Sequence, residues 1–466
     1  MLPTDTEAKR QAFDRMLGYH TERLAEAERR RSDHTRRHVG LELKFPVVMA
    51  TGGAAEGDVI SVFWRILAEK GWEPIHDSHV PRIIGACSRD DNGPDVLSTT
   101  TGICVLEFAV SHRCNLFDLH SRLEELAQVA GILADRTGAH LLGLGIQPVT
   151  PPGANLRTSK GRHLFWDQVL PPRRDTPHGY EGTVDLFTVI ADSQVHVDVT
   201  AHEATEAVNV LNGLAGVQLA MTANSTVWRG EVDYHHVAVR ELFWDWWLGG
   251  GARHGVPERP FEDLADYVRA TAQLKPLSVK RGDQHLGICH YPSFLEYFST
   301  ASATGITPES EEVALAPETD DIDLHDRAFW WDARLSRFGT IENRVSCQQP
   351  PSALLSPAAL VLGIVENMDE ARDLVSAYSW DQLRQLRVEA AHLGLRAQIG
   401  GDPVASLAQS VLELAEEGLR GRGLGEEFFL GPLWERCCRR EGAARQARTA
   451  FLLGGIDKLI EDFAWA

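Results

Sequence analysis

The feature of this sequence that most constrains its fold is a set of short segments in which apolar and polar residues alternate. In SQVHVDVT (193–200), every second residue is Ser or Val, and the residues between them are Gln, His, Asp and Thr. Successive side chains of a β-strand point to opposite faces, so this pattern predicts a strand with one apolar and one polar face. The segments 39–46, 97–110 and 339–346 share the pattern. Four such strands predict a sheet with only one buried face, which is typical of antiparallel sheets.

The polar faces of these four segments carry an unusual selection of side chains. Each face alone is compatible with a solvated strand, but such faces are usually rich in Thr, Lys, Ser and Glu. Together they offer carboxylates and an imidazole, which suit Mg²⁺, and a guanidinium, which suits phosphate. We therefore predict a site for a hard cation and a phosphate. Its candidate residues are Glu42, Lys44, Glu107, Gln194, His196, Asp198, Glu342 and Arg344.

The rest of the chain reads mainly as helix, and this determines the fold class that we predict. Strands interspersed with helices, without regular βαβ alternation, predict an α+β fold with a mainly antiparallel sheet. The acidic stretch 301–324, rich in Ser, Thr and Pro, is expected to be a loop or an excursion from the main fold. Helical periodicity covers 5–35, 115–138, 202–223 and almost everything from about 355 to the end.

Composition excludes several classes of partner. The 466 residues are 43% hydrophobic and 24% charged, which is ordinary for a globular protein with a sizeable core. A formal net charge of −20 argues against a surface for nucleic acid or an anionic membrane. The sequence has no apolar run of about 18 residues, and its charged, amphipathic first residues are not expected to act as a signal peptide. We expect a cytoplasmic protein with small-molecule substrates, no nucleic-acid partner and no membrane partner, in an oligomeric state that the sequence leaves open.

Common catalytic motifs are absent from the chain. It has no P-loop, no GxSxG and no GxGxxG between a strand and a helix. The stretch HEATE (202–206) has Glu206 where a zinc protease would have its second His. Seven cysteines without a CxxC pattern predict reduced thiols. A zinc hydrolase built on Glu42, His196 and His202 is chemically conceivable, but no ligand spacing supports it.

The ordered strands resemble the glutamate–cysteine ligase family, in particular its second bacterial group of carboxylate–amine ligases. The resemblance extends over residues 37–352. It implies a curved, mainly antiparallel sheet of the glutamine synthetase type, whose concave polar face holds ATP and Mg²⁺. It also implies three regions: a helix and connector at 1–36, a catalytic ligase domain at 37–352, and a packed helical region at 353–466. Further family-like pieces are GIQP (145–148), SKGR (159–162), TANSTVW (222–228) and HDRAFWWDAR (325–334).

The resemblance also implies a chemistry and a set of residue roles. Enzymes of this kind phosphorylate a carboxylate with ATP, and an amine then attacks the acyl phosphate to give an amide. The protein positions the reactants and stabilises phosphoryl charge. By position, Glu42, Glu107, His196 and Glu342 resemble metal ligands, and Arg344 resembles the guanidinium on the transferring phosphate. Lys44 and Gln194 are assigned to the nucleotide, and Gln194, Asp198 and Arg240 to substrate, although Arg240 is equally compatible with a surface helix.

Two departures from the family pattern fall on the catalytic face. The first strand normally reads Glu-x-Glu, but here it reads Glu42-Leu43-Lys44, and Thr100 replaces an Asp on the second strand. Our hypothesis is that the fixed charge of Lys44 replaces one Mg²⁺, so that the enzyme uses fewer metal ions. The alternative is that Lys44 pairs with Glu42 beside a disabled site.

The function predicted from the sequence is therefore an ATP- and Mg²⁺-dependent ligase that forms an amide bond. Its substrate is an amino acid or peptide, not necessarily glutamate or cysteine, and a role in specialised metabolism is compatible with the departures. Two alternatives stay open. One is a regulatory relative that binds a nucleotide or amino acid without catalysis, and the other is a phosphotransferase on the same fold.

Overall fold

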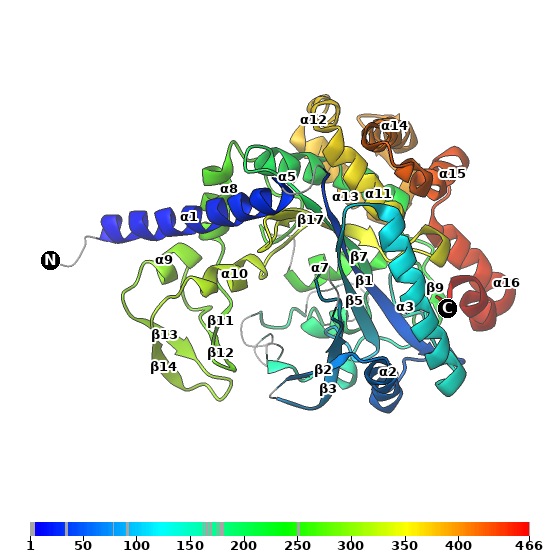
Figure 1. The fold of residues 1–466 in the computed structure, drawn as a ribbon, viewed down its shortest axis with the longest axis horizontal. Coiled ribbons are helices and arrows are strands. Elements are labelled where there is room, and N and C mark those ends of the chain that lie inside the picture. The colour runs from blue at the N-terminus through cyan, green and yellow to red at the C-terminus, as the bar shows by residue number, and fades with distance from the viewer. Residues whose placement is uncertain are drawn as a thin grey trace.

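The computed structural model describes residues 5–32, 36–77, 79–89, 93–161, 163, 166, 170–174, 176, 181–248 and 252–465. Within this part of the chain, a nine-stranded antiparallel sheet lies at the centre and helices pack around it (Figure 1). The strand order is β16-β17-β7-β1-β5-β4-β3-β2, and β6 also pairs with β1. The strands are β1 (Val39–Met49), β2 (Glu73–Asp77), β3 (Val80–Cys87), β4 (Val96–Thr99), β5 (Val105–Arg113), β6 (Ala139–Leu141), β7 (Asp192–Asp198), β16 (Ala333–Leu335) and β17 (Thr340–Cys347). The predicted α+β class with an antiparallel sheet is confirmed.

The alternation in β1 explains how the sheet is oriented. Leu41, Leu43 and Phe45 are fully buried in the main core, whereas Glu42 and Lys44 line a cavity on the opposite face. Phe45 stacks on Trp465 near the C-terminus, with ring centroids 4.4 Å apart. The apolar face is thus sealed by helices, and the polar face is left free for chemistry.

The segment predicted as one strand over 97–110 is in fact two strands, β4 and β5. The chain between them turns back so that β4 and β5 pair with each other. Ile103 donates its N–H to Leu156 outside the sheet, and a Cβ on Gly102 would lie 1.8 Å from the carbonyl oxygen of Thr188. These contacts with distant segments, which no local pattern records, interrupt the strand.

Of the two possibilities for 301–324, a loop is wrong, and an excursion from the central sheet is what the structure shows. This stretch contains β13 (Ala303–Ile306), β14 (Glu312–Leu315) and the start of α10 (Asp320–Asp326). The two strands complete a separate four-stranded sheet with β11 (Ser278–Arg281) and β12 (Gln284–Gly287), at the lower left of Figure 1. Arg281 anchors the acidic end of the stretch through a 2.7 Å contact with the buried Asp321.

Helices occupy the predicted regions. The long α1 (Asp5–Ser32) extends toward the N-terminus, and the red and orange helices of Figure 1 form the C-terminal part. Among the described residues, no single helix is long and apolar enough to cross a membrane. One pair of helices, Pro351–Glu366 and Met368–Ser376, has the necessary length and composition when the two are taken together, but the pair is sharply bent. The first helices are α2 (Gly57–Glu69), α3 (Leu116–Thr137), α5 (Ala204–Gly213), α6 (Ala215–Thr222), α7 (Val239–Leu248), α8 (Leu264–Gln273) and α9 (Phe294–Phe298). The C-terminal ones are α11 (Ser356–Glu366), α12 (Met368–Ser376), α13 (Trp380–Leu393), α14 (Val404–Arg422), α15 (Gly431–Arg439) and α16 (Ala443–Phe463).

Short two-stranded pairings complete the fold. They are β8 (Val227–Trp228) with β9 (Glu231–Val232), β10 (His254–Gly255) with β15 (Trp330–Trp331), and β18 (Gln398–Ile399) with β19 (Asp402–Pro403). The second of these pairs matters most for the site, because β15 leads directly into the edge strand β16 of the central sheet.

Candidate active site

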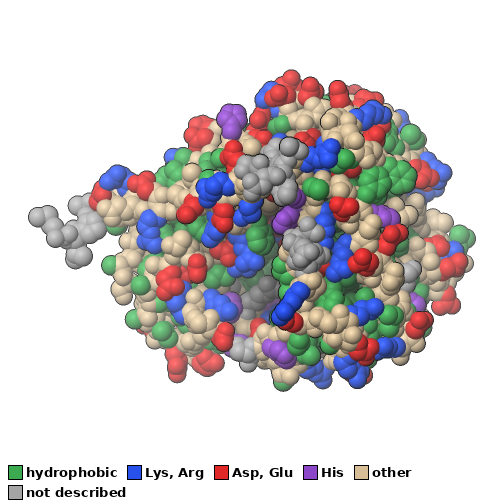
Figure 2. Space-filling view, in the orientation of Figure 1, with side chains coloured by type: hydrophobic (Ala, Val, Ile, Leu, Met, Phe, Trp, Pro, Cys, Tyr) green, Lys and Arg blue, Asp and Glu red, His purple; other side chains and the backbone are tan. Residues whose placement is uncertain are grey.

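The polar faces of β1, β5, β7 and β17 converge on one cavity of about 1090 Å³. The strand register brings them together, since Lys44 lies opposite Glu107, Glu42 opposite Gln194, and His196 opposite Glu342. Figure 2 shows a hollow near the centre of this face, with Lys and Arg side chains around it. The cavity is lined by eight of the nine candidates, namely Glu42, Lys44, Glu107, Gln194, His196, Asp198, Glu342 and Arg344.

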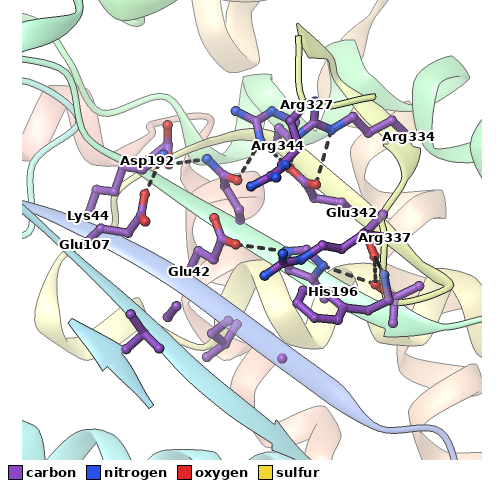
Figure 3. Close-up of a pocket in the computed structure, with 18 of the residues that line it drawn as sticks. Glu42, Lys44, Glu107, Asp192, His196, Arg327, Arg334, Arg337, Glu342 and Arg344 are labelled. Carbon is purple, nitrogen blue, oxygen red and sulfur yellow. Dashed lines mark hydrogen bonds and ion pairs between the residues drawn. The ribbon is translucent and has the colours of Figure 1, made fainter. Parts of the chain in front are cut away.

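Lys44 lies between two carboxylates and does not pair with Glu42. Its Nζ is 2.8 Å from Asp192 Oδ1 and 3.5 Å from Glu107 Oε2 (Figure 3). Gln194 donates to the same oxygen of Asp192 at 2.9 Å. Burial opposes the negative charge of Asp192, but Lys44 and neighbouring arginines outweigh it and lower the pKa of this carboxyl. Asp192 therefore remains ionised, and the interpretation of a Lys44–Glu42 pair is wrong.

Glu342 is held by two guanidinium groups. Arg334, from β16, donates to both of its carboxylate oxygens at 3.2 and 3.1 Å, and Arg344 pairs with it from two residues along β17. Arg344 also donates to Gln194 Oε1 at 2.7 Å. Burial disfavours the charge on Glu342, but the two arginines and His196 lower its pKa well below the ordinary range. Arg344 is therefore fixed in place with its guanidinium in the cavity wall.

Glu42 and His196 form the third polar pair. His196 Nε2 lies 3.4 Å from Glu42 Oε1, and His196 Nδ1 lies 3.2 Å from the hydroxyl of Thr340. Burial lowers the basicity of His196, but the nearby Glu42 and Glu342 carboxylates raise its pKa on balance. For Glu42, burial works against the charge, and interaction with His196 lowers the pKa. A half-buried imidazole thus faces a half-buried carboxylate.

Asp198, at the far end of β7, belongs to a different contact. Its Oδ2 accepts hydrogen bonds from the backbone N–H and the ring of His38, both at 3.0 Å. The ring of His38 in turn meets that of His112, with centroids 5.0 Å apart. Despite its burial, Asp198 has a lowered pKa because of these contacts with His38. Asp198 therefore lines the cavity as an ionised carboxylate, at the end opposite Lys44.

Arg240 does not reach the cavity. It is 2% exposed on α7, pairs with Glu241 at 2.7 Å, and donates to the carbonyl oxygens of Arg344 and Ser346. The sequence left two positions open for Arg240, a substrate site and the surface of a helix, and the structure shows neither. Arg240 instead supports the backbone of β17 from behind, next to the residue that carries the cavity guanidinium.

Sequence reasoning also missed residues that complete the site. Asp192 lies on the same face of β7 as Gln194 and His196, so extending the alternation by one pair would have found it. Arg334 lies in the quoted stretch HDRAFWWDAR but was given no role. Arg327 and Arg337 line the same end of the cavity and both contact Asp323, at 2.7 and 3.9 Å. His202, needed by the zinc alternative, is exposed and lies outside the cavity lining.

The additional family-like pieces lie around the site. Gln147 of GIQP is buried and donates to the carbonyl of Gly52, and Asn224 of TANSTVW donates to the carbonyls of Gly143 and Gln348. These bonds tie the loops behind β17 to one another. The last residue of SKGR, Arg162, lies outside the described residues.

The architecture defines a class of protein: an antiparallel sheet that presents acidic and basic side chains to one cavity. A solved glutamate–cysteine ligase from Francisella tularensis in complex with AMP shares the fold, with a TM-score of 0.50 at 9% identity, over 91% of this chain and 87% of that one. The model of glutamate–cysteine ligase family 2 matches residues 39–452. The chain belongs to this family.

Curated relatives agree with this assignment. A putative glutamate–cysteine ligase 2-3 of Mycolicibacterium smegmatis is 30% identical over 37% of this chain and 42% of its own length. A putative glutamate–cysteine ligase 2-1 of Nocardia farcinica is 26% identical over 74% of this chain and 77% of its own. The match to the first of these relatives thus spans less than half of that protein.

Proposed function

We propose that the protein is an ATP- and Mg²⁺-dependent carboxylate–amine ligase. The observation that carries this proposal is the convergence of Arg344, Arg334, Lys44 and several carboxylates on one cavity, in a chain of glutamate–cysteine ligase family 2. Such a cavity suits a reaction in which negative charge builds on a phosphoryl group. All its lining residues except Arg30 fall within 37–352, which supports that range as the catalytic domain.

The reaction that we propose has two steps. First, an oxygen of the donor carboxylate bonds to the γ-phosphorus of ATP, and the bond to the bridging oxygen breaks to release ADP. Next, the acceptor amine bonds to the carbonyl carbon, and the carbon–oxygen bond breaks with its electron pair on the departing phosphate. A protonated amine gives up two protons: one passes to a carboxylate of the cavity before the attack, for which Glu107 is our candidate, and the other passes to the departing phosphate as the amide forms.

The residue roles follow from the contacts. Arg344, held by Glu342 and Gln194, presents a charged fork to the transferring phosphoryl group, which is the geometry that guanidinium groups offer to phosphate. Lys44 contributes a second positive charge beside it. Because Asp192 and Glu107 anchor the ammonium, it is oriented before any substrate arrives.

The chemistry of the donors suits Mg²⁺ at Glu42, His196 and Glu342. His196 Nε2 is 3.4 Å from Glu42 Oε1 and makes no shorter contact within the described part of the chain, so this nitrogen and the carboxylate can turn together toward a metal ion. Among the described residues, no three His, Cys, Asp or Glu side chains are grouped as a metal site, and two arginines hold Glu342, so this carboxylate would have to turn away from them to reach a metal ion. When bound, Mg²⁺ would neutralise charge on the ATP phosphates. Lys44 takes the place of the second Glu of the family's first strand, and its ammonium stands in for one metal ion.

The test is incubation with ATP, Mg²⁺ and a panel of carboxylates and amines. We expect ADP release that requires both substrates, together with an amide detected by mass spectrometry. The variant Arg344→Gln should lower kcat by about 100-fold or more, since it removes one charged donor from the transition state. The exposed Arg445→Gln serves as the matched control. ATP binding without turnover would favour the regulatory alternative, and a stable phosphorylated product would favour a phosphotransferase.

A further inference from the structure

One end of the cavity is walled by aromatic rings. Phe187, Trp244, Trp247 and Trp330 all line it, and we call them the aromatic wall. The ring centroids of Phe187 and Trp244 are 4.2 Å apart, and those of Trp244 and Trp330 are 5.1 Å apart. Trp247 contacts both Phe187 and Trp330, at 5.0 and 5.7 Å. Such spacings are those of mutually packed aromatic side chains.

The aromatic wall lies at the Lys44 end of the cavity. Phe187 lies five residues before Asp192, the partner of Lys44, and Ile190 between them also lines the cavity. Trp330 comes two residues before Asp332, whose carbonyl accepts the backbone N–H of Arg344. The opposite end, beyond His196, is marked by the arginines at the right of Figure 3. The cavity is thus aromatic at one end and basic at the other.

The wall is not simply part of the closed core. Trp244 and Trp330 are only partly buried, so they present apolar ring surface to the cavity. Trp247 is 4% exposed, and its indole N–H makes no hydrogen bond within the described part of the chain. A buried indole N–H usually has a hydrogen-bond acceptor. Partly covered rings and an unused donor are the features of a pocket that a ligand completes.

Charge decides which reactant this end receives. The phosphates of ATP require cations, and these gather at Arg344, Arg334 and the basic end. Beside the wall, the carboxylates of Asp192 and Glu107 both contact the ammonium of Lys44. Their oxygens can accept hydrogen bonds from an incoming amine, whereas an ionised carboxylate or a phosphate has no hydrogen to donate to them.

We propose that the acceptor amine of this enzyme carries an aromatic side chain that packs against the aromatic wall. This inference rests on the proposed ligase function and names its acceptor class. A side chain as small as that of cysteine or alanine would leave the rings of Trp244 and Trp330 largely uncovered. An aromatic ring fills the space and meets the wall at favourable ring spacings. The amine then lies beside Glu107, the candidate proton acceptor.

The test compares acceptors that differ only in the side chain. With the full-length enzyme, ATP, Mg²⁺ and the donor found active, we expect kcat/KM for phenylalanine or tryptophan to exceed that for alanine about tenfold or more. Trp330→Ala should remove most of this preference, and Trp330→Phe should restore most of it, while the KM for ATP stays the same. The matched control is Trp434→Ala, which changes a partly buried Trp on α15 that does not line the cavity.

A binding measurement separates this inference from the ligase proposal. Calorimetry should show that phenethylamine binds the wild-type protein and binds Trp330→Ala about tenfold more weakly, whether or not turnover is found. Equal kcat/KM for alanine and phenylalanine would overturn the inference and leave the ligase proposal intact. A raised KM for ATP in Trp330→Ala would also overturn it, because the wall would then hold adenine. Absence of any amide product would overturn the ligase proposal, and absence of phenethylamine binding would overturn the aromatic site.

Discussion

Lys44 neutralises a carboxylate that the sheet has taken out of water. The Asp192 and Lys44 side chains are only 6% and 13% exposed, and their charged atoms are 2.8 Å apart. Removing one member of a buried ion pair leaves the other charge without compensation. We therefore expect Lys44→Met to lower the free energy of unfolding by about 3 kcal/mol at neutral pH, measured by urea denaturation.

The pH dependence of this loss has a defined sign. Although burial opposes its charge, the pKa of Asp192 is lowered in the folded protein, with Lys44 as the main opposing cause. Its contribution to stability is present above the ordinary Asp pKa of about 3.9 and is lost as pH falls through the folded value. The wild-type advantage over Lys44→Met should therefore shrink as the pH is lowered. Lys458→Met, at an exposed helical ion pair on α16, should show no such change.

The same residue tests whether a protein cation replaces a metal ion. Lys44→Glu would add a third carboxylate beside Glu107 and Asp192, in place of the ammonium that now lies between these two acids. We expect the nucleotide complex of this variant to bind one more divalent ion than the wild type, because a hard cation would be needed to hold the three acids together. Mn²⁺ titration followed by electron paramagnetic resonance measures the stoichiometry. An unchanged stoichiometry would contradict the hypothesis.

At the level of single residues, strand alternation was a good guide to what faces the cavity. It placed Glu42, Glu107, His196 and Glu342 on one face because side-chain direction in a strand is a local property. It failed for Arg240, whose burial behind β17 depends on how α7 packs, and for the partner of Lys44, which lies 148 residues away. Which charges pair across a sheet is decided by strand order and register, and a single strand contains neither.

Among the elements, α11 and α14 show how closely two helices can pack. A Cβ on Gly363 would lie 2.2 Å from the carbonyl oxygen of Ala415, and one on Gly418 would lie 2.3 Å from that of Gly363. Each glycine therefore permits the backbone of the other helix to approach. Gly363→Ala or Gly418→Ala should force the helices apart and lower the free energy of unfolding by about 2 kcal/mol in urea denaturation.

A glycine on the same helix provides the control for this prediction. Nothing lies within 4 Å of a Cβ built on Gly421, also on α14. Gly421→Ala should therefore stabilise the protein by about 0.5–1 kcal/mol, because alanine loses less backbone entropy in a helix. If all three variants behaved alike, close helix contact would not be the reason for the glycines.

Helices and strands could be predicted where a periodic pattern continues over many residues. The prediction failed where contacts with distant segments decide which structure forms. The repeat of buried leucines over 115–138 gave α3 almost to the residue, and its Asn115 cap is visible in the sequence. The stretch 301–324 looked like a loop because its charges and prolines have no period. It forms strands because β12 offers a free edge and Arg281 neutralises Asp321, and both partners lie outside the stretch.

At the scale of the whole molecule, the charge distribution opposes the binding of an anionic nucleotide except at one place. The formal net charge is −20, so ATP is repelled at long range. The basic end of the cavity, with Arg327 and Arg337, locally reverses this field. The aromatic end offers apolar contact instead. The two substrates should therefore respond differently to salt.

We expect the Kd for ATP to rise several-fold as KCl is raised from about 50 to about 500 mM, since salt screens exposed charges beyond a few ångströms. Over the same range, the Kd for phenethylamine should rise less than that for ATP, because it carries a single charge that lies beside the partly buried Asp192 and Glu107, where salt screens less. Calorimetry measures both.

The double variant Arg327→Gln, Arg337→Gln should bind ATP more weakly at low salt, and its Kd for ATP should depend less steeply on salt. The exposed Arg439→Gln, paired with Glu435 on α15, should retain the wild-type slope. A double variant with that same slope would mean that the phosphates do not bind at the basic end. The assignment of the two ends would then have to be reversed, because nucleotide and acceptor cannot occupy one end together.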